Sequence, residues 1–176
     1  MKKAFLFVSF LFVLYSCKKS DSGNSSGGYY IKCKIDGVDK AFNYNNMAKI
    51  MSLTQGATNV SIIGSAAPAG SSLEGISLGV NFFNGQVLQT NTIYSEDYSG
   101  IDYLAAAAYT PNNATYVFAS GIYTPTSLPF KLKVTNKTAT EMSGTFEGAF
   151  YKNVPGGNTT SEHVTITLGE FNVPIK

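Results

Sequence analysis

The sequence predicts an all-β protein: one antiparallel β-sandwich or barrel-like domain of about eight to ten strands over residues 29–176. Three observations support this fold class. Apolar and polar residues alternate with a period of two along several segments, as in strands that bury one face. Clusters of Gly, Pro and Asn separate these segments at short intervals. No long segment has the 3.6-residue periodicity of an amphipathic helix.

The alternation starts directly after the N-terminal region. Ile31, Cys33 and Ile35 fall on one face of a strand, and Gly37 turns the chain into the next strand. Cys33 is therefore expected to be a small core residue. Further strands are expected at Val38–Phe42, Asn59–Ser65, Leu73–Phe83, Tyr116–Ser120, Phe130–Thr135, Met142–Tyr151 and Val164–Phe171. Turns are expected at Gly56, Pro68–Gly70, Asn84–Gly85, Pro111–Asn113, Asn136–Lys137 and Pro155–Asn158.

Two segments are ambiguous between helix and strand. Asn46–Thr54 and the alanine-rich Asp102–Tyr109 have residues that suit either structure. Tight turns and glycines flank both segments, which favours strands.

Residues 1–16 have the pattern of a lipoprotein signal peptide. Lys2 and Lys3 precede an apolar segment from Ala4 to Tyr15. Twelve residues of helix cover about 18 Å, which is short of a hydrocarbon core of about 30 Å. Leu14-Tyr15-Ser16-Cys17 resembles a bacterial lipobox, in which the cysteine is acylated. The alternative is an ordinary signal peptide followed by an incidental cysteine.

Residues 17–28 are expected to be a lipidated Cys17 and a flexible tether. The segment Lys18–Gly28 contains no large apolar residue, so it has nothing to bury. Its root-mean-square reach is about 18 Å. The predicted partner of this region is the membrane, through the lipid anchor at Cys17, and the predicted location is the outer membrane. Both the periplasmic side and the cell surface are compatible with the sequence.

Composition argues against nucleic-acid binding. The chain has 13 basic residues, all of them lysine, and 11 acidic residues. From Cys17 onward the numbers of lysines and acids are equal, because Lys2 and Lys3 lie in the signal peptide. A neutral domain without arginine is a poor ligand for phosphates.

The C-terminal half resembles a family of small Bacteroidetes outer-membrane lipoproteins of unknown function. The matching segments are Phe130–Thr135, Met142–Gly148 and Val164–Phe171, together with Ile35-Asp36-Gly37. The resemblance implies an all-β domain on a lipid anchor. It assigns no catalytic residue.

One motif suggests a serine hydrolase. Gly75-Ile76-Ser77-Leu78-Gly79 fits the pattern G-x-S-x-G, and His163 follows later in the chain. In hydrolases the serine lies on a sharp turn from a strand to a helix. Here the alternation continues through Ser77 and no helix pattern follows. A serine hydrolase that uses Ser77 and His163 is therefore the less favoured alternative.

No cofactor or metal site is expected. His163 is the only histidine and falls on the polar side of its strand. Glu96, Asp97 and Asp102 are close in sequence but lack the spacing of a calcium loop.

Tyrosines gather between Tyr94 and Tyr123, where six of the eleven lie. Tyrosine gives rigid contact area with a polar end, which suits a sugar or a protein partner. Tyr98 and Tyr103, with Asp97 and Asp102 beside them, are the candidate ligand-binding residues. The alternative is that these rings pack onto the sheet.

The sequence thus favours a non-enzymatic, lipid-anchored β-domain of the cell envelope with a binding or structural role. A carbohydrate-contacting accessory lipoprotein is the alternative within the binding class. Neither a glycan nor a protein ligand is singled out.

Overall fold

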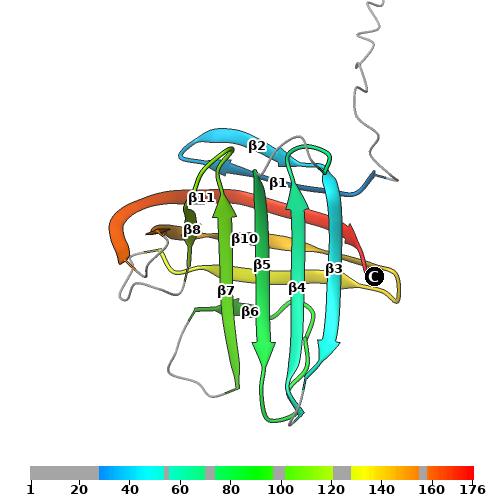
Figure 1. Cartoon of the computed structure of the whole chain (residues 1–176). Coiled ribbons are helices and arrows are strands. Elements are labelled where there is room, and N and C mark those ends of the chain that lie inside the picture. The colour runs from blue at the N-terminus through cyan, green and yellow to red at the C-terminus, as the bar shows by residue number, and fades with distance from the viewer. Residues whose placement is uncertain (1–27, 54–55, 70–73, 97–101, 121–127, 155–157) are drawn as a thin grey trace, which may run out of the picture.

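The fold is described from a computed structural model over residues 28–53, 56–69, 74–96, 102–120, 128–154 and 158–176. This part of the chain is built almost entirely of antiparallel strands, which confirms the all-β prediction (Figure 1). The strands are β1 (Tyr30–Ile35), β2 (Val38–Phe42), β3 (Tyr44–Ser52), β4 (Thr58–Ser65), β5 (Gly75–Phe82), β6 (Ile93–Ser95), β7 (Tyr103–Thr110), β8 (Val117–Ala119), β9 (Lys131–Lys137), β10 (Glu141–Val154) and β11 (Asn158–Pro174).

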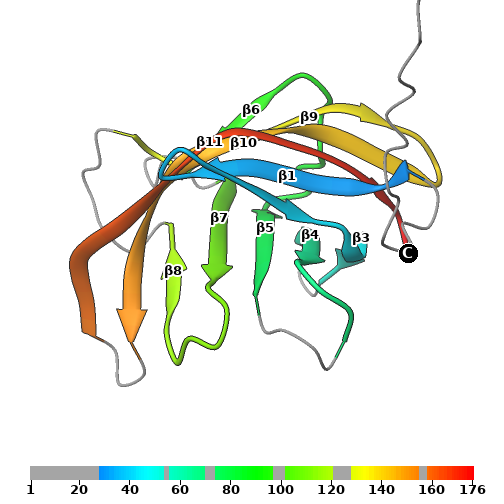
Figure 2. The ribbon, with the colours of Figure 1, turned by 90° about the horizontal axis from the view of Figure 1, so that it is seen from above.

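The strands form two layers that face each other across the core. The first layer contains β2, β1, β11, β10, β9 and β6, and the second contains β3, β4, β5, β7 and β8. In Figure 1 the strands of the second layer lie in front and cross those of the first layer, and Figure 2 shows the two layers from above. This is the crossed form of sheet packing, in which some strands pass from one layer to the other.

The two longest strands, β10 and β11, connect the layers. The first half of β10 pairs with β9, and its end pairs with β8 through Tyr151↔Ala119. The pairing of β10 with β11 shifts register between Phe146 and Gly148 and again between Tyr151 and Asn153. Such β-bulges bend a strand, which lets this pair turn the corner between the layers.

The sheet almost closes into a barrel-like shape. A parallel bridge joins Ala48 of β3 to Ile175, and the amide of Lys176 donates to the carbonyl of Ala48 at 3.0 Å. This contact brings the end of β11 to the first strand of the second layer.

Within the described residues, no helix is long and apolar enough to cross a membrane.

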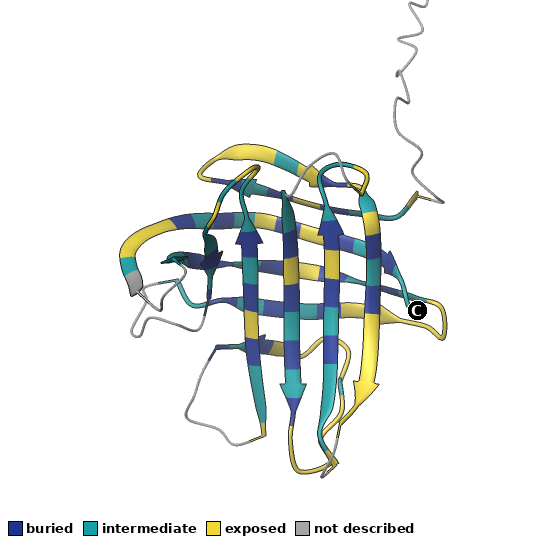
Figure 3. Ribbon diagram, viewed as in Figure 1, coloured by how far each residue is buried: buried dark blue, intermediate teal, exposed yellow. Residues whose placement is uncertain are grey.

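The core lies between the layers and is rich in phenylalanine. Figure 3 shows the buried positions alternating with exposed ones along the strands. Cys33 is 4% exposed, which confirms its predicted place in the core. In the described part of the chain, the buried apolar residues extend in sequence from Ile31 on β1 to Val173 on β11. The largest buried side chains are Phe42, Phe82, Phe130, Phe150 and Phe171.

A polar cluster joins the two layers beside Cys33. The ammonium of Lys40 lies 2.7 Å from Oε1 of Glu74, and the hydroxyl of Tyr109 donates to the same oxygen at 2.9 Å. Lys40 is on β2, whereas Tyr109 is on β7 in the opposite layer. Because Glu74 is largely buried, the contact fixes the spacing of the layers more firmly than an exposed ion pair does.

The ambiguous segments are strands, and several boundaries differ from the prediction. Asn46–Thr54 and Asp102–Tyr109 correspond to β3 and β7, because neighbouring strands pair with both of them. The turn expected at Asn136–Lys137 lies at Thr138–Thr140 instead, since β9 continues to Lys137 and Thr138 bonds back to Glu141. Similarly, β11 already begins at Asn158.

Candidate ligand-binding pocket

The chain changes layers in a short asparagine-rich segment. Asn43 is the single residue between β2 of the first layer and β3 of the second, and Tyr44, Asn45 and Asn46 follow it. Asn45 has a φ of 53°, a left-handed conformation that asparagine adopts more readily than most residues. The register of β3 against β4 shifts between Tyr44 and Met47, so a β-bulge lies at this corner.

The side chain of Asn46 is buried without a partner. Asn46 is 8% exposed, and neither its Nδ2 nor its Oδ1 has a hydrogen-bond partner among the described residues. A buried amide that loses its hydrogen bonds to water and gains none costs about 1–3 kcal/mol. Buried polar side chains usually have partners, so this amide calls for an explanation.

Gly64 on β4 makes room for this amide. A Cβ atom at Gly64 would lie 2.6 Å from Oδ1 of Asn46 and 2.9 Å from Cδ1 of Ile31. Any side chain at position 64 would therefore displace the asparagine. The two residues together keep a polar group in a region that is otherwise apolar.

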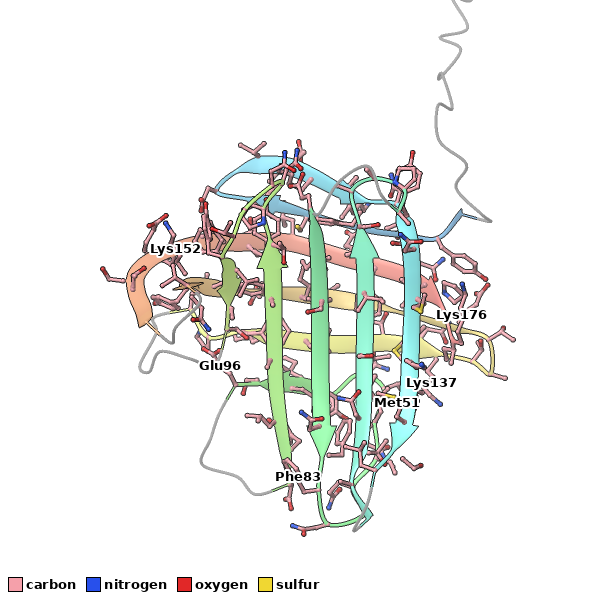
Figure 4. The ribbon with its side chains drawn as sticks, viewed as in Figure 1. Met51, Phe83, Glu96, Lys137, Lys152 and Lys176 are labelled. Carbon is pink, nitrogen blue, oxygen red and sulfur yellow. The ribbon has the colours of Figure 1, made fainter. Side chains whose placement is uncertain are left out.

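A pocket of about 420 Å³ opens beside Asn46. Its volume lies within the usual range for small-molecule sites. It lies at the end of the domain where β1 begins, where Lys176 approaches β3 and where the loop after β4 passes (Figure 4). We call it the asparagine pocket, and its lining residues are Tyr29, Asn43, Tyr44, Asn45, Asn46, Pro68, Ala69, Pro174 and Lys176.

Hydrogen bonds fix the walls of the asparagine pocket. Nδ2 of Asn45 donates to Oγ of Ser65 at 3.1 Å, and that hydroxyl lies 3.1 Å from the carbonyl of Tyr44. The hydroxyl of Tyr29 donates to Oε1 of Glu141 at 2.8 Å, and this hydrogen bond raises the pKa of Tyr29. The tyrosine is thus neutral at physiological pH and held by its hydroxyl.

The lining suits a ligand that both donates and accepts hydrogen bonds. Each asparagine amide has two donors and a carbonyl acceptor. Tyrosine rings add flat apolar surface with a polar edge. A sugar ring, which has several hydroxyl groups and an apolar face, matches this combination. An anion would meet a single positively charged side chain in the lining, that of Lys176.

Two other hollows lie on the outer face of the first layer. One, of about 290 Å³, is lined in part by Lys131, Glu147 and Leu168, and the other, of about 470 Å³, shares Leu168. Their charged side chains form the ion pairs Lys32–Glu170, Lys34–Asp39 and Lys131–Glu147. None of the lining residues of these two hollows has a buried polar side-chain atom that lacks a partner. The asparagine pocket is therefore the stronger candidate.

Two of the described tyrosines of the tyrosine-rich segment lie in the core, since Tyr94 and Tyr109 are 3% and 5% exposed. The half-buried ring of Tyr103 packs edge-on against Tyr94 at 5.2 Å between centroids. Tyr98 and Asp97 lie outside the described residues. Asp102 is exposed, and its carbonyl accepts a hydrogen bond from the amide of Phe83.

Ser77 and His163 do not form a catalytic pair. Ser77 lies in the middle of β5, where no turn lifts it from the sheet. Register pairs join it to His163 in a single row through Ala108, Ala119 and Tyr151. Four strand spacings of about 4.8 Å put the two residues about 19 Å apart along the sheet. A nucleophile and its base need hydrogen-bond contact, so this pair lacks the geometry of a hydrolase.

The described residues include no group of three or more His, Cys, Asp or Glu side chains placed to hold a metal ion. His163 is exposed, as expected, and its ring lies 5.2 Å from that of Tyr151.

The asparagine pocket was not predicted from the sequence. The signal that could have indicated it is Asn43-Tyr44-Asn45-Asn46, three amides and an aromatic ring in four residues. No protein-family model, curated protein or solved structure matches the chain.

Proposed function

We propose that this protein is a lipid-anchored β-domain of the bacterial cell envelope that binds a neutral saccharide in the asparagine pocket. The observation that carries the proposal is the buried amide of Asn46, which has no hydrogen-bond partner and belongs to a residue that lines the pocket. A ligand hydroxyl would supply both a donor and an acceptor to it. The amide then costs stability in the free protein and strengthens binding in the complex.

The chemistry of the walls supports a neutral ligand. Asn43, Asn45 and Asn46 are uncharged and bond hydroxyls in either direction. The ring of Tyr29, held by Glu141, offers a flat surface to the apolar face of a sugar. Because the side chains of Asn45 and Tyr29 are already held by hydrogen bonds within the protein, they lose little conformational freedom when a ligand binds.

The anchor rests on the lipobox-like Leu14–Cys17 and on the polar tether that follows it. The tether leads directly to Tyr29, a wall of the asparagine pocket. With a reach of about 18 Å for the tether, the pocket would stay close to the membrane surface. The proposed ligand is therefore a glycan of the cell envelope, and the proposed location is the outer membrane.

Binding is tested on an array of neutral and acidic oligosaccharides probed with the full chain purified in detergent. We expect retention on neutral glycans and a loss of at least tenfold in Asn46→Leu, because leucine has a similar shape but no hydrogen-bonding groups. Thr145→Val, on the outer face of the first layer, is the matched control and should bind as the wild type. Retention on acidic glycans only, or equal binding by Asn46→Leu, contradicts the proposal.

The anchor is tested by metabolic labelling with palmitate. We expect label on the wild-type chain and none on Cys17→Ala. Label that persists in Cys17→Ala contradicts the lipid anchor but leaves the saccharide site standing.

A further inference from the structure

The outer face of the second layer is almost free of charge. Three rows of four register-paired residues cross β3, β4, β5 and β7. Of these residues, Lys49 alone is charged. We call this surface the neutral face, and its rows are Met47–Ile63–Ser77–Ala108, Lys49–Ser61–Gly79–Ala106 and Met51–Asn59–Asn81–Leu104.

The outer face of the first layer has the opposite character. It carries the ion pairs Lys32–Glu170, Lys34–Asp39 and Lys131–Glu147, whose side chains are between 35% and 86% exposed. One domain thus has a charged outer face and a neutral one. A sheet face that is exposed to water usually carries polar and charged side chains, so the neutral face is an exception.

The neutral face is also smooth. Its centre consists of Ser61, Ser77, Gly79, Ala106 and Ala108, whose side chains are short. Asn59 and Asn81 bond to each other across the strands, with Nδ2 2.8 Å from Oδ1. Short side chains lose little rotamer freedom when they are covered, and two such sheets can approach to about 10 Å. Depletion of charge at the centre of a patch is typical of protein interfaces.

We propose that the neutral face is the interface between two copies of this chain, which pack face to face about a two-fold axis. A neutral surface is complementary to itself, so the same patch can serve both partners. Lys49 lies on the edge strand β3, where its long side chain can reach solvent beyond the partner's sheet. The surface is distinct from the asparagine pocket, and the inference does not depend on the proposed function.

The area is sufficient for a dimer of modest affinity. Four strands at about 4.8 Å and eight residues at about 3.3 Å give about 500 Å² of flat surface. The row through Ser77 continues by way of Ala119 and Tyr151 to His163, which enlarges the patch. A standard interface buries about 800 Å² on each partner. Figure 3 shows this face toward the viewer, with exposed and half-exposed positions along its strands.

The test is cross-linking of the full chain in the cells that express it, with a short bis-maleimide. Ser77→Cys puts a thiol at the centre of the neutral face, and Thr145→Cys puts one on the charged outer face as the matched control. Cys33 is buried and Cys17 is common to both variants, so neither changes the comparison. We expect a covalent dimer of twice the chain mass from Ser77→Cys, at least tenfold more abundant than from Thr145→Cys.

A second substitution separates a specific interface from random collision. Ala106→Lys, added to Ser77→Cys, places a charge at the centre of the patch and should reduce the covalent dimer at least tenfold. Ala106 is exposed, so the lysine leaves the core intact. Thr145→Lys in the same background should leave the dimer unchanged. Equal cross-linking from the two faces, no dimer from either Ser77→Cys or Ser61→Cys, or insensitivity to Ala106→Lys overturns the inference.

Discussion

At the scale of single residues, Cys33 shows how burial controls a titratable group. Its side chain points into the core between the layers, beside the ammonium of Lys40. Burial raises the pKa of the Cys33 thiol from its ordinary value of 9.0 to about 12, and the positive charge of Lys40 offsets only part of this increase. The thiol therefore stays protonated and chemically inert in the folded protein.

This pKa makes the stability of the fold depend on pH in the alkaline range. Between about pH 9 and 12 the unfolded chain loses the thiol proton while the folded chain keeps it. The free energy of unfolding must then fall as the pH rises through this window, and the contribution is complete below pH 9. We expect a smaller fall in Cys33→Ala than in the wild type, measured by urea denaturation from pH 8 to 10.5. Identical slopes would show that the thiol is not held protonated by the fold.

At the scale of elements, glycines determine how closely the strands of the first layer pack. A Cβ atom at Gly144 of β10 would lie 2.7 Å from Cζ of Phe171 and closer still to the carbonyl oxygen of Lys133. A Cβ atom at Gly79 of β5 would meet its nearest atom at 3.4 Å, an ordinary contact. The two positions are both inside strands, but the first tolerates no side chain.

We therefore expect Gly144→Ala to lower the free energy of unfolding by about 1–3 kcal/mol, the usual cost of overpacking. Gly79→Ala is the matched control and should be neutral or slightly stabilising, because alanine restricts the unfolded chain. Chemical denaturation of the two variants decides the point. Equal stability of Gly144→Ala and Gly79→Ala would mean that β9, β10 and β11 can separate at no cost.

Alternation of residues was enough to predict most strands but not all of them. Ile31, Cys33 and Ile35 face the core, as the pattern of the sequence requires. β6 was missed because three residues are too few to show a period, and it is fixed by pairing with β9 and by the ring of Tyr94 against Phe82. The alanines of β7 have no strand preference of their own, so their conformation depends on the strands on either side.

The pocket depends on contacts that the sequence does not contain. Alternation from Phe42 through Asn46 to Ala48 places Asn46 on the inner face. That its amide has no partner follows from Gly64 on the next strand and from the bulge at Asn45. The burial of Tyr94 and Tyr109 likewise depends on the layer opposite each of them, because exposed and buried strand tyrosines look alike in sequence.

At the scale of the whole molecule, ligand binding and dimer formation would use different surfaces of the domain. The corner between β2 and β3 forms the asparagine pocket at the end of the domain that follows the proposed tether. The neutral face lies on the second layer, and the ion pairs lie on the outer side of the first. If the chain is anchored, confinement to a membrane raises its local concentration and favours a dimer of modest affinity.

The central claim is that Asn46 is kept for binding at a cost in stability. The most direct measurement is the melting temperature of Asn46→Leu against the wild type, without ligand, with Asn46→Ala as a second variant in case leucine crowds Gly64. Removing a buried amide that lacks partners should recover about 1–3 kcal/mol, which raises the melting temperature of Asn46→Leu by several degrees. Asn46→Ala should melt no lower than the wild type. A fall of several degrees in both variants would show that the amide holds the fold together, and it would contradict the account of the pocket.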